Sequence, residues 1–463
     1  MNAMSTLPPG SRRRTAISKR QFLKTAAGVL GSFVIVPARV LAGRGQASPN
    51  EKLNIAGIGI GFRGFRNLQQ CAPENIVALC DVDWGLAAPA AEHFSQAKTY
   101  TDYRRMLDER KDIDAVLVST PDHTHAVITA AAMQHGCHVY TEMPLAHDVW
   151  EARRLAEIAR QTGVVTQLGN ESHSHYSIRR VCEWVWSGKL GPVREVECWS
   201  NRPEWPQGMD QPPKSCPPPQ SLDWDLWIGP APMVDYSSAY HPGDWKGWRN
   251  FGTGALGAMG CYVMDPVFWA LKLDEAPAFT VEAESTGITA LAYPRASTIR
   301  YRFPARGDMP PVTLTWRDGD RQPPLPDGWP ENRQSPCHGT FLLGDEHTLV
   351  VDQVAENYEW TRLVPETLMR SVDQPPKTLP RIEPGPRWDP TRHQQDWLQA
   401  CKSGKQAGSN FASSGPLTEM VLLGNVALAA GKPIHWDKEK MEITNDADAN
   451  RLLRREYRTG WSL

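Results

Sequence analysis

Three glycines and one acidic residue near residue 60 have the spacing of a dinucleotide site. Gly59, Gly61 and Gly64 follow one apolar run, and Asp81 ends the next apolar run. In a strand–turn–helix unit with this pattern, the first glycine makes the tight turn and the second lets the backbone approach a diphosphate. The third lets the helix pack closely on the strand. The helix N-terminus then offers free N–H groups to the phosphates. The pattern predicts a nucleotide-binding site.

Asp81 also bears on the type of cofactor. A carboxylate at this place accepts hydrogen bonds from both hydroxyls of a ribose and repels a 2′-phosphate, so the sequence favours NAD over NADP. Arg63 lies inside the turn and could pair with such a phosphate, which weakens the preference. Phe62 and Arg63 complete the turn, and we expect both to contact the cofactor together with the glycines.

Length, composition and charge fit a globular protein of two or three domains. The chain has 463 residues, of which 41% are hydrophobic and 22% charged, and its formal net charge is −2. This charge provides no basic field, so we expect no nucleic-acid partner. The nine cysteines form no C-x-x-C pair and are expected to be mostly small buried residues. No Cys or acidic residue stands at zinc-site spacing from the two His-x-His pairs, so we expect no metal site.

Residues 1–42 have the features of an export signal. A basic region precedes a short apolar stretch, and Val-Leu-Ala at 40–42 resembles a small-residue cleavage site. The run 18–24 resembles a twin-arginine signal with lysine in the first basic place. The alternative is an uncleaved anchor, but the apolar stretch is shorter than the roughly 20 residues of a membrane span. We expect a periplasmic or otherwise exported protein without stable membrane insertion, and a linker at 43–50.

Strand-like and helical runs alternate from residue 51 to about residue 145. This alternation predicts an α/β fold with a doubly wound parallel sheet and helices on both faces. Ligands bind such sheets at the carboxyl ends of the strands. The loops that follow the predicted strands should therefore converge on one crevice; they lie at 59–64, 81–83, 120–125 and 142–144. A further helix is predicted from Asp148 to about Gln161, where Asp148 and Glu151 have capping-box spacing.

The pattern changes in the second part of the chain. After a helix that ends near Gly188, strand-like segments follow one another without intervening helices, which predicts an open, mostly antiparallel sheet. These segments lie at 193–201, 279–283, 296–303, 312–317 and 347–351. A last long helix is predicted at 417–430.

With these elements placed, the chain after the export signal resembles the Gfo/Idh/MocA oxidoreductase family, which includes glucose–fructose oxidoreductase and inositol dehydrogenase. The likeness rests on Gly59-x-Gly61-x-x-Gly64, Ser119 to His125, Glu142-Met143-Pro144, Leu168-Gly169-Asn170, Gly191-Pro192-Val193, Gly254 to Cys261 and Gly415 to Glu419. The resemblance implies a Rossmann domain at 51–170 and a C-terminal α/β domain at 171–463 that binds substrate and joins subunits into a homo-oligomer through its sheet. It also implies oxidation of a sugar or polyol by hydride transfer to NAD(P), with Thr120, His125 and Glu142 beside the cofactor.

Three positions depart from the family pattern. Met143 replaces the lysine of Glu-Lys-Pro, and Ala258 and Tyr262 stand where the pattern has an aspartate and a histidine. In the family these three residues handle the proton of the substrate hydroxyl. Methionine and alanine cannot move a proton, and a tyrosine with a pKa of about 10 is a poor base at neutral pH unless its surroundings lower that pKa. The sequence thus predicts an intact cofactor site and an altered chemical site.

Tyr262 and His173 are the candidates for moving the proton. Tyr262 holds the pocket position, although it could simply fill the space of a histidine. His173 and His175 follow a predicted strand near Asn170 and should face the cleft, where an imidazole could serve as general base. The alternative is a solvated or structurally hydrogen-bonded histidine.

Four residues are candidates for substrate binding: Asn170, Arg202, Trp205 and Lys246. A flat ring such as that of Trp205 could stack on a sugar, and Lys246 could contact substrate oxygens. The alternatives are ordinary aromatic packing for the tryptophan and a surface cation for the lysine.

Two hypotheses follow. The first is an exported NAD-dependent oxidoreductase that acts on a sugar, polyol or glycoside, by hydride transfer alone or by NAD-assisted glycoside cleavage. A tightly held cofactor suits an exported enzyme, which cannot count on a cytoplasmic NADH pool. The second is a catalytically silent protein that binds a nucleotide or a sugar. The three substitutions favour it, whereas the intact glycine turn, Asp81 and Glu142 argue against it.

Overall fold

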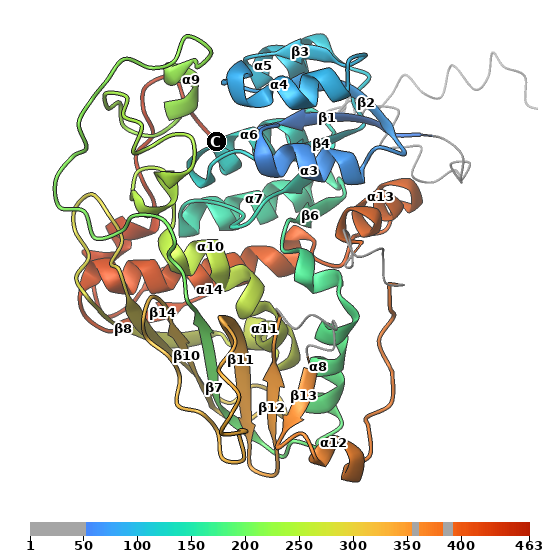
Figure 1. The fold of residues 1–463 in the computed structure, drawn as a ribbon, viewed down its shortest axis with the longest axis vertical. Helices are drawn as coiled ribbons and strands as arrows, with labels where there is room; N and C mark the ends of the chain where they lie inside the picture. The colour runs from blue at the N-terminus through green and yellow to red at the C-terminus, as the bar shows by residue number, and fades with distance from the viewer. Residues whose placement is uncertain (1–51, 354–360, 383–391) are drawn as a thin grey trace, which may run out of the picture.

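Figure 1 shows the fold in a computed structural model, which describes residues 52–353, 361–382 and 392–463. The predicted export signal and linker lie outside these residues. Two sheets organise the chain, and the predicted α/β class with a parallel and a mostly antiparallel sheet is confirmed. No helix among the described residues has the length and apolar character that a bilayer crossing requires.

The N-terminal sheet is parallel, with the strand order β3-β2-β1-β4-β5-β6. Strands β1 and β4 are almost entirely buried, because helices cover both faces of a parallel sheet. The strands are β1 (Asn54–Ile58), β2 (Asn75–Cys80), β3 (Lys98–Tyr100), β4 (Ala115–Val118), β5 (His138–Thr141) and β6 (Thr166–Leu168). The sequence pattern did not predict the short strand β3, whereas β6 corresponds to the strand expected near Asn170.

Five helices connect these strands, and their bounds follow from local signals. They are α3 (Phe62–Gln70), α4 (Trp84–His93), α5 (Tyr103–Glu109), α6 (Asp122–Gln134) and α7 (Val149–Thr162). The predicted capping box of α7 is present: Asp148 accepts a hydrogen bond from the Glu151 N–H, and Glu151 reaches back to the Asp148 N–H. Gly163, at φ +69°, ends α7 in the left-handed conformation that glycine adopts without strain.

The second sheet has nine strands in the order β13-β12-β11-β7-β10-β9-β8-β14-β15. Its pairs are antiparallel except for β7 with β10, which run parallel. Its strands are β7 (Val193–Ser200), β8 (Ala278–Ser285), β9 (Ser297–Phe303), β10 (Val312–Arg317), β11 (His338–Gly344), β12 (Thr348–Val351), β13 (Thr361–Val364), β14 (Ile434–Asp437) and β15 (Glu442–Ile443). Sequence reasoning missed β11, which inserts between β7 and β12.

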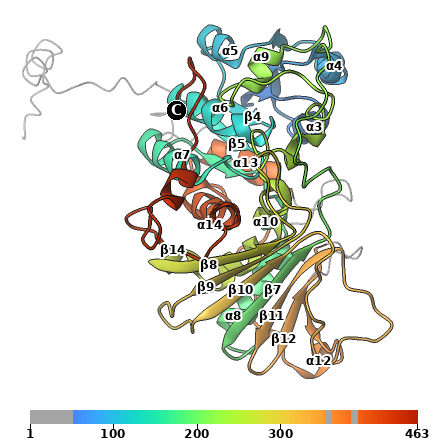
Figure 2. The same ribbon diagram turned by 90° about the vertical axis from the view of Figure 1, so that its left-hand side faces the viewer.

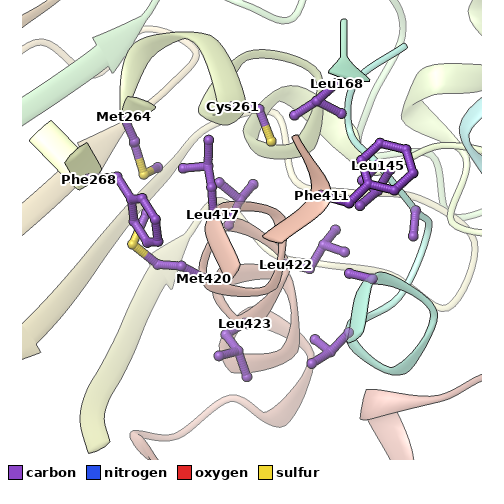
Figure 3. Packing of buried hydrophobic residues seen from close by; sticks show 14 of the residues in the cluster. Leu145, Leu168, Cys261, Met264, Phe268, Phe411, Leu417, Met420, Leu422 and Leu423 are labelled. Carbon is purple, nitrogen blue, oxygen red and sulfur yellow. The ribbon is translucent and has the colours of Figure 1, made fainter. Parts of the chain in front are cut away.

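Longer helices pack on one face of this sheet and join it to the Rossmann domain (Figure 2). Helix α14 packs against α7 as well as against β8, so it contacts both domains. In Figure 3, Leu417, Met420 and Leu423 of α14 lie among buried side chains of α10, α11, β6 and the loop after β5. The helices after β6 are α8 (Tyr176–Trp186), α9 (Trp224–Ile228), α10 (Gly254–Val263), α11 (Asp265–Ala270), α12 (Leu368–Ser371), α13 (His393–Ser403) and α14 (Phe411–Ala430), of which α9 and α12 are short and α13 packs on the Rossmann side.

Two late segments of the chain return to the Rossmann domain. Helix α13 buries Trp397, Leu398 and Cys401 against Ile55 and Leu79 of the parallel sheet. The chain after α14 passes α7 and ends beside the Rossmann helices (Figure 2). The spatial Rossmann unit therefore includes residues far beyond position 170.

Charged side chains line the open face of the second sheet. Arg300 on β9 lies 3.1 Å from Glu284 on β8, and Arg302 lies 2.7 Å from Glu282. Alternate residues of β8, such as Val281, point to the helices and are buried. The face through which we expect subunits to associate is thus polar along β8 and β9.

Candidate functional site

The glycine-rich turn lies between β1 and α3, and each glycine has a distinct environment. Gly59 has a φ of +74°, and its N–H donates to the Cys80 carbonyl across 2.9 Å. A Cβ added at Gly64 would lie 1.9 Å from the Gly59 carbonyl oxygen, so glycine lets α3 approach the strand. A Cβ added at Gly61 would meet nothing closer than Leu86, at 3.6 Å. A side chain as small as that of alanine would therefore fit at Gly61 with only ordinary van der Waals contact.

A cavity of about 370 Å³ opens at the carboxyl ends of β1, β2 and β4. Three of the four loops predicted to converge line it, and the loop at 142–144 lies beside it rather than on its wall. The exposed ring of Phe62 also contributes to the wall. Thr120 lines the cavity too, and its buried hydroxyl has no hydrogen-bond partner among the described residues. The wall thus offers open glycine backbone and an unsatisfied hydroxyl to a polar ligand.

Asp81 directly follows β2, and backbone N–H groups fix its carboxylate. Its Oδ2 accepts from the Ile60 N–H at 2.7 Å, and its Oδ1 accepts from the Asp83 N–H at 2.9 Å. Burial raises the pKa of the Asp81 carboxyl, against the effect of these N–H groups. Each carboxylate oxygen can accept a further hydrogen bond, and Asp102 places a second carboxyl group on the same wall.

An insertion at 201–253, between β7 and α10, covers the cavity from the second domain (Figure 1). Its buried aromatic cluster includes Trp227, Tyr240, Trp248 and Phe251. Asp83, just after β2, anchors the insertion: its Oδ2 lies 2.8 Å from His241 Nε2, and its Oδ1 accepts from the Ser221 hydroxyl at 2.8 Å. These contacts hold Trp227 and His241 on the cavity wall.

Trp461 also lines the cavity, although it lies three residues from the end of the sequence. Its ring centroid is 6.5 Å from that of Tyr103, and the Arg104 guanidinium lies 4.7 Å from the ring. Sequence reasoning did not identify Trp461. No local pattern marks it, because only the return of the chain to the Rossmann domain brings it to the site.

Arg63 forms the centre of a polar network at one side of the cavity. Its Nε lies 3.0 Å from Glu142 Oε1, and one of its terminal nitrogens lies 3.0 Å from Glu171 Oε2. The same nitrogen donates to the Tyr262 hydroxyl at 3.3 Å, and Asn67 donates to Glu142 at 2.6 Å. Burial lowers the pKa of Arg63, but Glu142, Tyr262 and Glu171 outweigh it, so the pKa is raised. The charge of Arg63 is thus engaged by two carboxylates.

Tyr262 is held in this network as a neutral phenol. Its hydroxyl donates to the Gly169 carbonyl at 3.2 Å. Burial raises the pKa of Tyr262, and the nearby Arg63 lowers it only in part. The shift runs opposite to what a general base at neutral pH requires, so the geometry does not support the predicted catalytic role of Tyr262 as a base.

His173 and His175 do not line the cavity, contrary to expectation. His173 Nδ1 lies 2.9 Å from Asp265 Oδ2, and its ring stacks on Trp269 with centroids 5.0 Å apart. His175 accepts a hydrogen bond from the Ser177 N–H at the start of α8. His173 is thus held against α11, and His175 against the first turn of α8, so both rings have structural partners.

Lys246 does line the cavity, from a short 3₁₀ turn in the insertion. Its Nζ lies 4.4 Å from the Trp245 ring centroid and 5.6 Å from that of Trp205. Burial lowers the pKa of the Lys246 ammonium, against the attraction of Asp122 and Asp244. A lysine shifted in this direction is better suited to exchange a proton near neutral pH.

The other predicted substrate residues are placed differently. Trp205 contacts Lys246 but is not on the cavity wall, and Arg202 pairs with the neighbouring Glu204. Asn170 is fully buried: it donates to the Cys261 carbonyl and accepts from the Ser409 hydroxyl. Both ends of its amide are therefore occupied by the protein.

His125 links two of the predicted loops. Its Nδ1 lies 2.7 Å from the Pro144 carbonyl, and its Nε2 lies 2.7 Å from the Thr120 carbonyl. The ring does not reach the cavity wall. His125 thereby holds the loop of Thr120 close to the loop at 142–144. It can affect a bound cofactor only by positioning these two loops.

Two family models match the chain, one for each domain. The model described as an oxidoreductase family with an NAD-binding Rossmann fold matches residues 53–170. The model described as the C-terminal alpha/beta domain of the oxidoreductase family matches residues 192–307 and 376–463. The chain belongs to the Gfo/Idh/MocA oxidoreductase family.

Individual proteins match this chain either over a limited part of its length or at low sequence identity. Alpha-N-acetylgalactosaminidase of Shewanella oneidensis is 31% identical over 173 residues, which cover 32% of this chain and 38% of that protein. The chain therefore spans well under half the length of this curated relative. The structure of the Bordetella pertussis WlbA dehydrogenase with NADH and UDP-GlcNAcA has a TM-score of 0.57, with 16% identity, and covers 83% of this chain and 98% of that chain. A levoglucosan dehydrogenase complex with NADH has a TM-score of 0.55, with 17% identity, and covers 83% and 99%.

The three Gfo/Idh/MocA positions that depart from the family pattern are now located. Met143 is half-buried and packs against the core, and Ala258 lies on α10 one turn before Tyr262. A positive charge is nevertheless present, because Arg63 contacts Glu142, the residue before Met143. Sequence reasoning assigned Arg63 to the cofactor, and its contact with Glu142 could not be read from local spacing.

Proposed function

We propose that this protein is an NAD-dependent oxidoreductase that acts on a sugar, polyol or glycoside. The observation that carries the proposal is the cavity that brings together the open glycine turn at Gly61, the unsatisfied Thr120 hydroxyl and the fixed carboxylate of Asp81. These are the groups that a dinucleotide requires: bare backbone for a diphosphate and a carboxylate for a ribose.

The residues present fit NAD. The turn at Gly59–Gly64 and the first N–H groups of α3 would hold the diphosphate, and Asp81 would hold the adenosine ribose. Thr120 would find its missing partner in the cofactor. When bound, NAD supplies a carbon that accepts hydride from an alcohol.

The same wall favours NAD over NADP. Asp81 would repel a 2′-phosphate, and the guanidinium of Arg63 is engaged by Glu142 and Glu171. The carboxylate of Asp102 on the same wall is paired with Arg104. Arg63, which the sequence offered as a partner for this phosphate, already has two carboxylate partners. We further propose that the cofactor is held tightly, since the insertion covers the cavity and a Trp461 ring closes part of its wall.

Lys246 is the best-placed group for proton transfer. It lines the cavity, and its lowered pKa increases the neutral fraction that can accept a proton from a substrate hydroxyl. Tyr262 has a raised pKa, and His173 faces Asp265 away from the cavity. Arg63 cannot act as a base because arginine stays protonated, and its charge is engaged by Glu142 and Glu171.

A second candidate is NAD-assisted cleavage of a glycoside. The 31% identity with the Shewanella oneidensis alpha-N-acetylgalactosaminidase favours it over one third of the chain. In such a reaction the sugar is oxidised and later reduced again, so NAD returns to its starting state. This cycle would suit an exported enzyme with a retained cofactor.

The experiment measures cofactor binding and turnover separately. Calorimetry with NAD and NADP, on protein freed of any bound nucleotide, should show tighter binding of NAD. The NAD-loaded protein is then mixed with sugars, polyols and nitrophenyl glycosides. Growth of the reduced-nicotinamide absorbance indicates a dehydrogenase, and nitrophenol release that requires NAD without net reduction indicates a glycoside-cleaving enzyme. NAD binding without either reaction, for any compound, would favour a silent binding protein, and no nucleotide binding would refute the proposal.

A further inference from the structure

A second cavity, of about 300 Å³, lies on the side of α7 and α14 near the C-terminal segment. Its apolar floor comes from Leu422, Val426 and Ala429 of α14 and from the ring of Tyr293. None of the residues assigned to the nucleotide cavity lines it. A volume near 300 Å³ is at the lower end of the range for small-molecule sites.

Four arginines surround this cavity: Arg249, Arg451, Arg454 and Arg455. Arg455 is paired with the buried Glu151, and Arg451 lies 3.7 Å from Asp448 at the surface. Asp148 also lines the wall and accepts from the Arg455 N–H, so part of the positive charge is offset. Within the described part of the chain, no carboxylate pairs with Arg249 or Arg454. Arg249 donates to the Thr289 carbonyl, and Arg454 lies over the Trp150 ring.

Three buried polar atoms on the same wall lack hydrogen-bond partners among the described residues: His147 Nε2, Asn425 Oδ1 and Arg455 Nη1. Asn425 is 9% exposed, and its amide nitrogen donates to the Thr253 carbonyl at 2.8 Å, which leaves Oδ1 as a free acceptor. An unpaired buried polar atom costs about 1–3 kcal/mol, so three of them in one cavity indicate a missing polar occupant.

The chemistry of the three atoms defines the occupant. Arg455 Nη1 donates only and therefore seeks an oxyanion or another acceptor, whereas Asn425 Oδ1 accepts only and seeks a hydroxyl. The unpaired charges of Arg249 and Arg454 add to the preference for an anion. Burial lowers the pKa of His147, so its ring is neutral, and the backbone of Arg249 and Gly252 lies beside it. The unpartnered Nε2 of this ring can face a hydroxyl.

We propose that this cavity binds a small polyhydroxylated oxyanion, either a sugar acid or a sugar phosphate, at a site separate from the nucleotide cavity. The oxyanion lies toward Arg249, Arg454 and Arg455, and a hydroxyl group meets Asn425. The site does not depend on the proposed redox reaction, and its ligand need not be the substrate.

Calorimetry on the full chain saturated with NAD tests this site. D-gluconate and D-glucose 6-phosphate are the probes, and D-glucose is the neutral control. We expect saturable binding of at least one anion, with one anion per chain, and at least tenfold weaker binding of glucose. Comparison of the two anions distinguishes a carboxylate ligand from a phosphate ligand.

Matched variants locate the binding. Arg249→Gln and Arg454→Gln should each weaken anion binding by about tenfold or more, the effect of one lost charge-assisted contact, while NAD binding is unchanged. Arg194→Gln removes the same charge at a half-exposed position on β7 that does not line the cavity, and it should leave anion binding unchanged. Circular dichroism and melting curves confirm that each variant is folded. Absence of binding at millimolar concentration, equal binding of glucose, or unchanged anion affinity in both variants would overturn the proposal.

Discussion

Substitution by alanine should raise the stability of the protein at Gly61 and lower it at Gly64, although both glycines belong to the same turn. Gly61 has φ −69° and ψ 170°, which any residue can adopt, and an added Cβ would have Leu86 at 3.6 Å as its nearest neighbour. Gly61→Ala should therefore fold normally and gain about 0.4–1 kcal/mol of stability through the lower entropy of the unfolded chain. At Gly64, the added Cβ would lie 1.9 Å from the Gly59 carbonyl oxygen. Gly64→Ala should lose about 1–3 kcal/mol or more, because α3 must move away from β1.

The effect of Gly61→Ala on NAD binding should be opposite to its effect on stability. The methyl group of Gly61→Ala enters the cavity, where the diphosphate must approach the backbone. Loss of one charge-assisted hydrogen bond of about 1.5–3 kcal/mol weakens binding roughly 10- to 150-fold. Gly61→Ala should therefore bind NAD at least tenfold more weakly than the native protein while melting at an equal or higher temperature.

Thermal melting without cofactor and calorimetry with NAD give the two readouts. Gly163→Ala is a useful control, since Gly163 lies at the end of α7 with nothing within 4 Å of an added Cβ but with a φ of +69°. It should cost stability without changing the affinity for NAD. If Gly61→Ala binds NAD as tightly as the native protein, the diphosphate does not lie at this turn and the reasoning fails.

Four further outcomes are expected. Lys246→Met should lower kcat at least about 100-fold, while the Kd for NAD changes less than about threefold. Lys246→Arg should also have a low kcat, because arginine cannot accept a proton. A normal kcat in Lys246→Arg would exclude proton transfer by Lys246. Burial raises the pKa of Asp318 to about 6, so the folded state keeps a proton that the unfolded chain releases above about pH 4. The free energy of unfolding should therefore fall by about 1–3 kcal/mol as the pH rises from about 4 to 6. An equal dependence of this free energy on pH in the native protein and in Asp318→Asn would contradict the prediction. Size-exclusion chromatography with light scattering should show a homo-oligomer, and reversing both charges in Arg300→Glu/Arg302→Glu should shift it toward the monomer; an unchanged mass would place the interface elsewhere. Replacing Lys19-Arg20 with two glutamines should retain the protein in the cytoplasm in cell fractionation, and continued export would show that the segment is not a twin-arginine signal.

The sequence predicted those features that depend on neighbours in the chain. The glycine spacing implied one role for each glycine, and the environments of Gly59 and Gly64 match the tight turn and the close helix packing expected of them. The capping box of α7 and the bounds of its helix were readable for the same reason. Local spacing succeeds because backbone dihedral angles and helix ends are set by residues a few positions apart.

The tertiary structure decided which side chains share the site. Trp461 reaches the nucleotide cavity only because the chain returns to the Rossmann domain, and β11 enters the second sheet beside a strand more than 100 residues earlier. His173 contacts Asp265, which is 92 residues away in the sequence, and therefore does not face the cavity. Burial and charge partners set the direction of a side chain and the sign of its pKa shift, and both come from segments distant in sequence. The cofactor turn was therefore visible in the sequence, whereas the choice of Lys246 over Tyr262 and His173 required the fold.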